Sequence, residues 1–422
     1  MSFFNFKNGQ LCAEALPLSA IAEQVGTPCY VYSRAAFEYQ WRALDTAFGD
    51  HPHTICYAVK ANSNLAVLNL LARLGSGFDI VSEGELHRVL AAGGDPSKIV
   101  MSGVSKSHNE IELAIKHNIR SINVESVAEL ERVQQVAARI DKVAPIALRV
   151  NPDVDPETHP YISTGLEEAK FGIAMEAAFA AYGQADAMSH IEVHGIACHI
   201  GSQITKTSPF EDALDLVLKM VKRLADKNII IQQLDLGGGL GIDYQGEQPP
   251  SATDYVQAML DGLKKHAINL PISVEPGRYI AGNSGVLLTR VEYLKHNASK
   301  SFAVVDAGMN DLLRPSLYQA YHDIVNVQLK NDVKDASIEE QTYDIVGPVC
   351  ESADVLGYDR TLNISPDDLL AVKSAGAYAF VMASTYNSRP KPPEIMVDDD
   401  QFHIIRRRET KDDLVLGETM LP

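Results

Sequence analysis

The sequence lacks closely spaced cysteine pairs and long hydrophobic runs. These absences argue against a protein held together by disulfides and against a protein that spans a membrane. Its five cysteines are scattered over 422 residues with no Cys-x-x-Cys pair, so we expect reduced thiols in a cytoplasmic protein and no disulfide framework. No apolar run reaches the roughly 18 residues that a transmembrane helix requires. We therefore expect no membrane partner.

Positive charge is also scarce. The chain carries 37 Lys and Arg residues against 55 Asp and Glu residues, which gives a formal net charge of −18 at pH 7. Nucleic acids and anionic membranes bind to basic faces, so we expect neither as a partner. The overall charge does not exclude a small anion held by a few arginines and backbone amides.

Strand-like and helix-like segments alternate from about residue 34 to residue 282. Eight such units predict a closed (β/α)8 TIM barrel with parallel strands; an open doubly wound sheet is the competing topology. The strands are expected at Ile55–Val59, Gly77–Val81, Ile99–Ser102, Ser121–Val124, Ile146–Val150, Ile191–Ile200, Ile231–Leu236 and Ile272–Glu275. The helices are expected at Leu65–Leu74, Glu83–Ala92, Asn109–His117, Val127–Ile140, Met175–Ala187, Phe210–Asp226 and Thr253–His266.

The pattern changes after Gly282. Short β-like runs separated by turns replace the alternation, as at Gly285–Tyr293, Ser301–Val305 and Phe402–Arg407. We predict a mostly antiparallel β domain over residues 283–422. Residues 1–33 are expected to join it, because this extended N-terminal segment needs a sheet to pair with.

The stretch Tyr57–Asn62 ends the first predicted barrel strand and carries Lys60. Most lysines are solvated surface charges, but a lysine at the end of an apolar strand is costly to bury without a partner. Desolvation can lower the pKa of such an amine and make it a nucleophile, as in Schiff-base enzymes. We therefore predict that Lys60 is a functional residue.

The other strand ends are also polar or glycine-rich, and in a parallel barrel the chemistry lies at these ends. Each residue alone could be a cap or a turn residue. The set comprises Asp79, Ser102, Asn123, Glu125, Arg149, Asn151, His199, Gly237–Gly239 and Glu275.

Two of these ends suggest an anionic cofactor. The run Gly237–Gly239 follows the seventh strand, where bare backbone amides can bind a phosphate, although a tight turn is the simpler explanation. Glu275 ends the eighth strand; it could pair with Arg278 or face the ring nitrogen of pyridoxal phosphate. His199 could stack on a cofactor ring or be a packed core histidine. We predict no metal site, since His194 and His199 point to opposite faces of a strand.

Together these motifs resemble those of the alanine-racemase-like, pyridoxal-phosphate-dependent decarboxylases, and most closely the members that act on meso-diaminopimelate. The resemblance runs from about Thr27 to Val397. It is carried by Tyr57–Asn62, Thr158–Gly165, Lys170–Ile173, His199–Ser202, Gly237–Gly239, Glu275–Arg278, Gly347–Asp354, Gly376–Tyr378 and Tyr386–Pro390. Ala169 departs from the family, which more often has a polar residue there.

The resemblance implies pyridoxal 5'-phosphate as the cofactor and decarboxylation of meso-2,6-diaminopimelate to L-lysine as the activity. It implies that Lys60 links the cofactor covalently, that His199 stacks on its ring and that Glu275 faces the ring nitrogen. It implies further cofactor contacts from Asp79, Ser202, Gly238, Gly239, Gly277, Arg278 and Tyr378. Substrate contacts are implied for Arg278, Arg314, Tyr318, Glu351 and Tyr378, with Cys350 as proton donor. The implied active unit is a homodimer with shared sites.

Several alternatives remain open. Arg314 could be a surface charge, and Cys350 could be a small buried apolar residue, the commonest state of a free cysteine. Another decarboxylase of the same fold, acting on ornithine, arginine or carboxynorspermidine, is one alternative function. An amino acid racemase and a catalytically inactive binding protein are two others.

Overall fold

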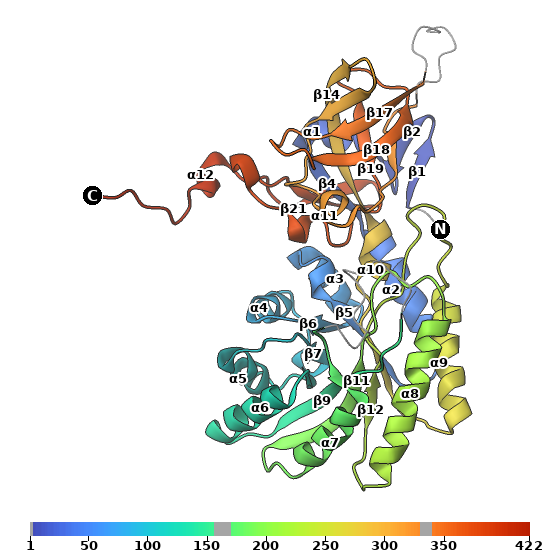
Figure 1. The fold of residues 1–422 in the computed structure, drawn as a ribbon. Helices are drawn as coiled ribbons and strands as arrows, with labels where there is room; N and C mark the ends of the chain where they lie inside the picture. Colours follow the sequence, from blue (N-terminus) through green and yellow to red (C-terminus); the bar gives the residue numbers. More distant parts are fainter. Residues whose placement is uncertain (1–2, 156–169, 330–339) are drawn as a thin grey trace. The chain divides into compact units, whose positions relative to one another are not determined.

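The computed structural model describes residues 3–155, 170–329 and 340–422, and its chain divides into two compact units (Figure 1). One unit comprises residues 38–243 and 247–280, and the other comprises residues 1–37, 244–246 and 281–422. The motif Thr158–Gly165 and Ala169 lie outside the described residues. In the described part of the chain, no helix is both long enough and apolar enough to cross a membrane.

The first unit is a closed barrel of eight parallel strands, which confirms the predicted TIM barrel. Each strand pairs with the next, and β13 pairs with β5 to close the ring. The strands are β5 (His53–Ala58), β6 (Gly77–Ile80), β7 (Ile99–Met101), β8 (Ser121–Val124), β9 (Ala144–Asn151), β11 (Ile191–Cys198), β12 (Gln233–Asp235) and β13 (Ile272–Val274). A two-residue strand, β10 (Ile173–Ala174), adds to β9.

Helices follow the strands, as the alternation predicted, and serine caps begin several of them. The Ser107 hydroxyl accepts a hydrogen bond from the backbone amide of Glu110, and the Glu110 carboxylate accepts one from the backbone amide of Ser107. This capping box satisfies amides that the first turn leaves free. The helices are α3 (Leu65–Arg73), α4 (Glu83–Ala91), α5 (His108–Lys116), α6 (Val127–Arg139), α7 (Met175–Asp186), α8 (Ser208–Ala225) and α9 (Ala252–His266). Helix α2 (Arg34–Phe48), which precedes the barrel, was not predicted from the sequence.

The second unit is built on a mostly antiparallel sheet, as predicted. Its strand order is β18-β17-β15-β14-β4-β20-β21, with β19 also paired to β14. Among the described strands of this sheet, only the pairs β15–β17 and β4–β20 are parallel. The strands are β4 (Cys29–Ser33), β14 (Gly285–His296), β15 (Ser301–Val305), β16 (Ile324–Asn326), β17 (Gln341–Val346), β18 (Val355–Leu362), β19 (Leu369–Val372), β20 (Glu394–Asp398) and β21 (Gln401–Arg406).

The last part of the N-terminal segment, strand β4, pairs within this sheet. Strand β4 lies between β14 and β20, and buried apolar residues from all three strands form one core cluster. The remaining N-terminal elements are β1 (Phe4–Lys7), β2 (Gln10–Ala13), β3 (Leu16–Pro17) and α1 (Leu18–Val25). Short helices complete the chain: α10 (Arg278–Ala281), α11 (Arg314–Tyr318) and α12 (Lys411–Leu414).

Candidate active site

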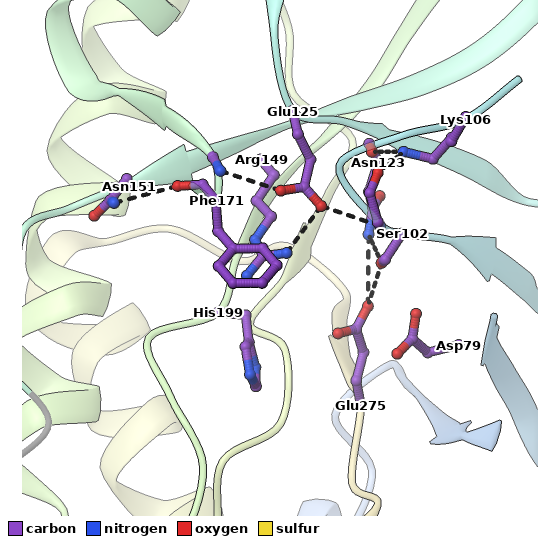
Figure 2. A network of polar contacts seen from close by, with 12 residues as sticks. Asp79, Ser102, Lys106, Asn123, Glu125, Arg149, Asn151, Phe171, His199 and Glu275 are labelled. Atoms are coloured by element: carbon purple, nitrogen blue, oxygen red, sulfur yellow. Dashed lines mark hydrogen bonds and ion pairs between the residues drawn. The ribbon is translucent and has the colours of Figure 1, made fainter. Parts of the chain in front are cut away.

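A small cavity lies at the carboxyl ends of the barrel strands, and its wall is mostly polar. Figure 2 labels Ser102, Asn123, Arg149, His199 and Glu275 from this wall. Seven of the nine residues that line it have polar side chains. The lining residues are Lys60, Ser102, Asn123, Arg149, Ala197, Cys198, His199, Asp235 and Glu275. Six residues singled out at strand ends therefore meet here, as parallel strands in a closed barrel allow: Lys60, Ser102, Asn123, Arg149, His199 and Glu275. Asp79, Glu125, Asn151 and Gly237–Gly239 are not among the lining residues.

Lys60 lies in a single helical turn, Val59–Ala61, directly after β5. Its Nζ atom is 2.5 Å from Oδ2 of Asp79. The register of β6 with β5 places Asp79 beside Ala58, close to Lys60 in the chain. The Asp79 side chain is fully buried, while that of Lys60 is 39% exposed. The amine is thus held at the rim of the cavity by a buried carboxylate and stays accessible.

Glu275 follows β13 and shares the cavity floor with Asp235, the last residue of β12. The Asn123 side-chain amide donates to Asp235 at 3.0 Å and to Glu275 at 3.5 Å. Burial, followed by the charges of Asp235 and Asp79, raises the pKa of Glu275 well above its usual value. Burial likewise raises the pKa of Asp235, against the opposing hydrogen bonds from Asn123 and Gly237. This floor favours a proton or a cation next to Glu275.

His199 follows β11 and forms part of the cavity wall. Its Nδ1 atom accepts a hydrogen bond of 3.1 Å from the backbone amide of Gly238, which assigns the ring proton to Nε2. Desolvation and the positive charges of Arg149 and Lys60 lower the pKa of His199 well below its usual value. The ring is therefore neutral at pH 7, which suits stacking on another flat ring.

The glycine run after β12 approaches other backbone too closely for any side chain. A Cβ atom on Gly238 would lie 2.2 Å from the carbonyl oxygen of Glu275, and Gly239 has a φ of +114°. On the same unit, the guanidinium of Arg278 donates to the hydroxyl of Ser202 at 3.0 Å and 3.2 Å. Gly277, between Glu275 and Arg278, is buried. Bare amides and an arginine at the ends of β12 and β13 suit a phosphate.

The other predicted site residues belong to the second unit. Arg314 begins α11 and is buried, with its guanidinium 2.9 Å from Nε2 of His322 and over the ring of Tyr244 at 4.9 Å. Tyr318 ends the same helix, so Arg314 and Tyr318 share one helical turn. Tyr378 is half-buried and has a φ of +55°.

Cys350 and Glu351 lie on an exposed loop that other residues of this unit hold in place. The backbone amide of Cys350 donates to Asn387 at 3.0 Å, and the hydroxyl of Tyr386 donates to the Glu351 carboxylate. Asp354 anchors the loop by accepting the amides of Val349 and Met309, each at 2.6 Å. The alternative that Cys350 is a buried apolar residue is wrong for this chain, because its side chain is exposed.

Asp235 was not predicted as a site residue from the sequence. This residue lies between two leucines, Leu234 and Leu236, in an apolar run. An unpaired carboxylate is costly to bury there, so the pattern indicates a carboxylate with a buried partner. Its partner Asn123 is 112 positions away in the chain, so the pairing itself could not be read from the sequence.

Residues 34–282 match the family described as the pyridoxal-binding domain of pyridoxal-dependent decarboxylases. Over its full length the chain is 56% identical to the diaminopimelate decarboxylase of Pseudomonas aeruginosa, covering 100% of both chains. It is 54% identical to the diaminopimelate decarboxylase of Vibrio cholerae, again covering 100% of both chains.

Solved structures show the same similarity. The diaminopimelate decarboxylase from M. jannaschii, in a complex with L-lysine, is 37% identical with a TM-score of 0.94, and the match covers 99% of this chain and 98% of that one. The enzyme from Helicobacter pylori, also complexed with L-lysine, is 42% identical with a TM-score of 0.89, over 94% and 98% of the two chains.

Proposed function

Because this chain belongs to the pyridoxal-dependent decarboxylase family, we propose that it converts meso-2,6-diaminopimelate to L-lysine and carbon dioxide, the last step of lysine biosynthesis. One observation carries the proposal: an accessible lysine, Lys60, is paired with a buried carboxylate in a cavity that also holds His199 and Glu275. Full-length identity of 56% to a diaminopimelate decarboxylase supports the substrate.

The barrel residues fit pyridoxal 5'-phosphate, the cofactor of this family. Asp79 Oδ1 is buried without a hydrogen-bond partner, and Glu275 is a buried carboxylate that favours a neighbouring cation, so both suit a protonated pyridine ring. The close approach of Gly238 to Glu275 leaves only backbone amides at the phosphate position. Residues 34–282 would thus hold the cofactor.

Each barrel residue then has one task toward the cofactor. Lys60 would hold the aldehyde carbon covalently, the neutral His199 ring would stack on the pyridine ring, and Glu275 would keep the ring nitrogen protonated. The phosphate would lie among Gly238 and Gly239 of the glycine run and the barrel residues Ser202, Gly277 and Arg278, and Tyr378 of the second unit would add a contact. When bound, the cofactor withdraws electrons from the substrate α-carbon as carbon dioxide leaves.

The second unit would recognise the far end of the substrate. Diaminopimelate carries an amino acid group at both ends, so its distal carboxylate needs a cationic clamp and its distal ammonium needs an anion. Arg278, Arg314 and Tyr318 would bind the carboxylate, and Glu351 would bind the ammonium. Cys350 or Lys60 would deliver the proton to the α-carbon after carbon dioxide has left.

We also propose that the active unit is a homodimer in which Cys350 and Glu351 complete the site of the partner subunit. Their exposure on a braced loop of the single chain supports this arrangement. Mixing Lys60→Ala chains with Cys350→Ala chains should restore activity, because a mixed dimer has one intact site. Mixtures that stay inactive under conditions that exchange subunits would contradict shared sites. The free thiols are consistent with a cytoplasmic enzyme.

The direct test supplies meso-diaminopimelate to the protein loaded with pyridoxal phosphate and measures lysine and carbon dioxide. Ornithine, arginine and carboxynorspermidine are tested in parallel, because none of the three has the distal carboxylate that Arg314 would bind. Lysine formed from meso-diaminopimelate far faster than any product from these compounds is the expected result. Faster turnover of any other substrate, or interconversion of stereoisomers without loss of carbon dioxide, would overturn the proposal.

A further inference from the structure

A buried carboxylate behind the cavity wall, Glu125, connects three parts of the barrel (Figure 2). It follows β8, and its side chain is 2% exposed. Oε1 accepts from Nη1 of Arg149 at 2.9 Å and from the amide of Gly103 at 3.0 Å, and Oε2 accepts from the amide of Gly172 at 3.1 Å. Glu125 thus joins the end of β9 to the segments that follow β7 and precede β10.

Arg149 is the member of this group that reaches the cavity. It lines the same space as Lys60 and His199, and its guanidinium lies over the ring of Phe171 at 4.9 Å. Its charge is one of the causes that keep His199 neutral. An arginine side chain has several rotatable bonds, so the two contacts from Glu125 and Phe171 determine where this charge lies.

A second ion pair holds Glu125 itself. The carboxylate of Glu129 accepts from the backbone amide of Glu125 at 2.7 Å and from Nζ of Lys106 at 2.9 Å. The Lys106 side chain is 1% exposed, and its ammonium also donates to the carbonyl oxygens of Gly103 and Asn123, both at 2.7 Å. Three acceptors satisfy all three protons of the ammonium. The strand end that carries both Asn123 and Glu125 is therefore fixed from behind.

We propose that Glu125 is a positioning residue for the reaction: it holds the Arg149 guanidinium at the cavity wall, where that charge acts on bound cofactor and on His199. The proposal rests on the proposed function, since it assigns a task to residues around the same cavity. A purely structural ion pair would stabilise the barrel without affecting the chemistry. If Glu125 acts by holding Arg149, replacing Glu125 changes the activity only while Arg149 is present. If the pair is purely structural, the two replacements act independently.

A double-mutant cycle separates them. The variants are Glu125→Gln, Arg149→Met and the double variant, each measured for pyridoxal phosphate affinity of the apo form, for the absorbance spectrum of the bound cofactor and for kcat and KM. We expect Glu125→Gln to lower kcat/KM or cofactor affinity by about 10- to 100-fold, the loss of one hydrogen bond to a charged group. In the Arg149→Met background the same change should have less than about a 2-fold effect.

Glu394→Gln is the matched control. Glu394 is also a buried glutamate paired with an arginine, but its partner Arg406 does not line the cavity. This control should lower thermal stability and leave the cofactor spectrum and kcat/KM unchanged. If Arg149→Met fails to fold, Arg149→Lys completes the cycle.

Additive effects of Glu125→Gln and Arg149→Met would overturn the proposal, as would a folded Glu125→Gln variant with wild-type affinity, spectrum and kinetics. Cofactor affinity and spectrum can be measured without any substrate. The cycle therefore remains decisive even if wild-type protein fails to decarboxylate meso-diaminopimelate, in which case only the proposed function falls.

Discussion

Replacing Gly238 by alanine should disable the cofactor site more than it destabilises the fold. The added Cβ would lie 2.2 Å from the backbone oxygen of Glu275 and 3.1 Å from its carbonyl carbon. Ordinary carbon–oxygen contacts are about 3.3 Å or longer, so the two segments must separate by about 1 Å. They are tied together by a 2.7 Å hydrogen bond from the Glu275 amide to the Gly237 oxygen, which therefore resists the separation.

The expected magnitudes follow from that displacement. Overpacking of this kind costs about 1–3 kcal/mol of stability. A shift of about 1 Å in a catalytic group can lower a rate about 100-fold. Because Glu275 and the amides proposed to bind the phosphate move together, we expect Gly238→Ala to raise the dissociation constant of pyridoxal phosphate and to lower kcat. The assays are cofactor titration of the apo form, turnover of meso-diaminopimelate and thermal unfolding.

Gly183→Ala is the control for this substitution. Gly183 lies in α7, and a Cβ there would meet no atom within 4 Å. Alanine in a helix interior is favoured over glycine by about 1 kcal/mol, so this variant should be unchanged or slightly more stable and fully active. If Gly238→Ala binds the cofactor and turns over like Gly183→Ala, the close approach of Gly238 to Glu275 has no functional role and our account of the phosphate site is wrong.

Three further predictions concern single side chains. Lys60→Ala should abolish the yellow cofactor absorbance and the borohydride-stable label; a label at another position would exclude Lys60 as the attachment site. Cys350→Ala should bind cofactor normally but turn over slowly, and wild-type rates would remove Cys350 from proton delivery. For Glu85, burial raises the pKa from 4.5 to about 7. Its protonated form is therefore favoured on folding, and the stability it contributes at low pH is lost between about pH 4.5 and 7. Thermal unfolding should show Glu85→Gln gaining stability relative to wild type over that range, and parallel pH curves would contradict the shift.

The barrel could be predicted from the sequence because each of its units carries a local signal. Apolar runs such as Ile99–Ser102 are too short for helices, and helices such as Val127–Arg139 show one apolar face. Helix α2 was not predicted, although Phe37, Trp41, Leu44 and Phe48 follow a helical spacing. It precedes the first barrel strand, so it lies outside the regular alternation of strands and helices that indicated the barrel. In the β domain, β18 was not predicted; its residues Tyr358–Thr361 include charged and exposed side chains that obscure a strand pattern.

The cavity was predictable only in part, because sequence position identifies strand ends but not the pairs that form between them. Lys60 and Asp79 could be named individually since each is a charge at the end of an apolar strand. Their ion pair depends on the register of β5 with β6, which places Ala58 beside Asp79. Lys106 gave no signal, because it follows a loop glycine and serines and looks like a surface lysine. Its burial depends on three acceptors from β8, α6 and the loop after β7.

The buried charges at this end of the barrel suit a cofactor whose ring nitrogen carries a proton. Asp79 is compensated by Lys60, and Glu125 by Arg149, each within a hydrogen-bonded pair. Glu275 and Asp235 have neutral donors such as Asn123, and burial together with the charge of Asp235 raises the pKa of Glu275. A barrel interior does not retain such a pair for stability alone, since apolar residues of similar size would cost less. A ring nitrogen that carries a proton would give Glu275 the positive partner that the floor residues do not supply, so the arrangement is best understood as a site built for that ring.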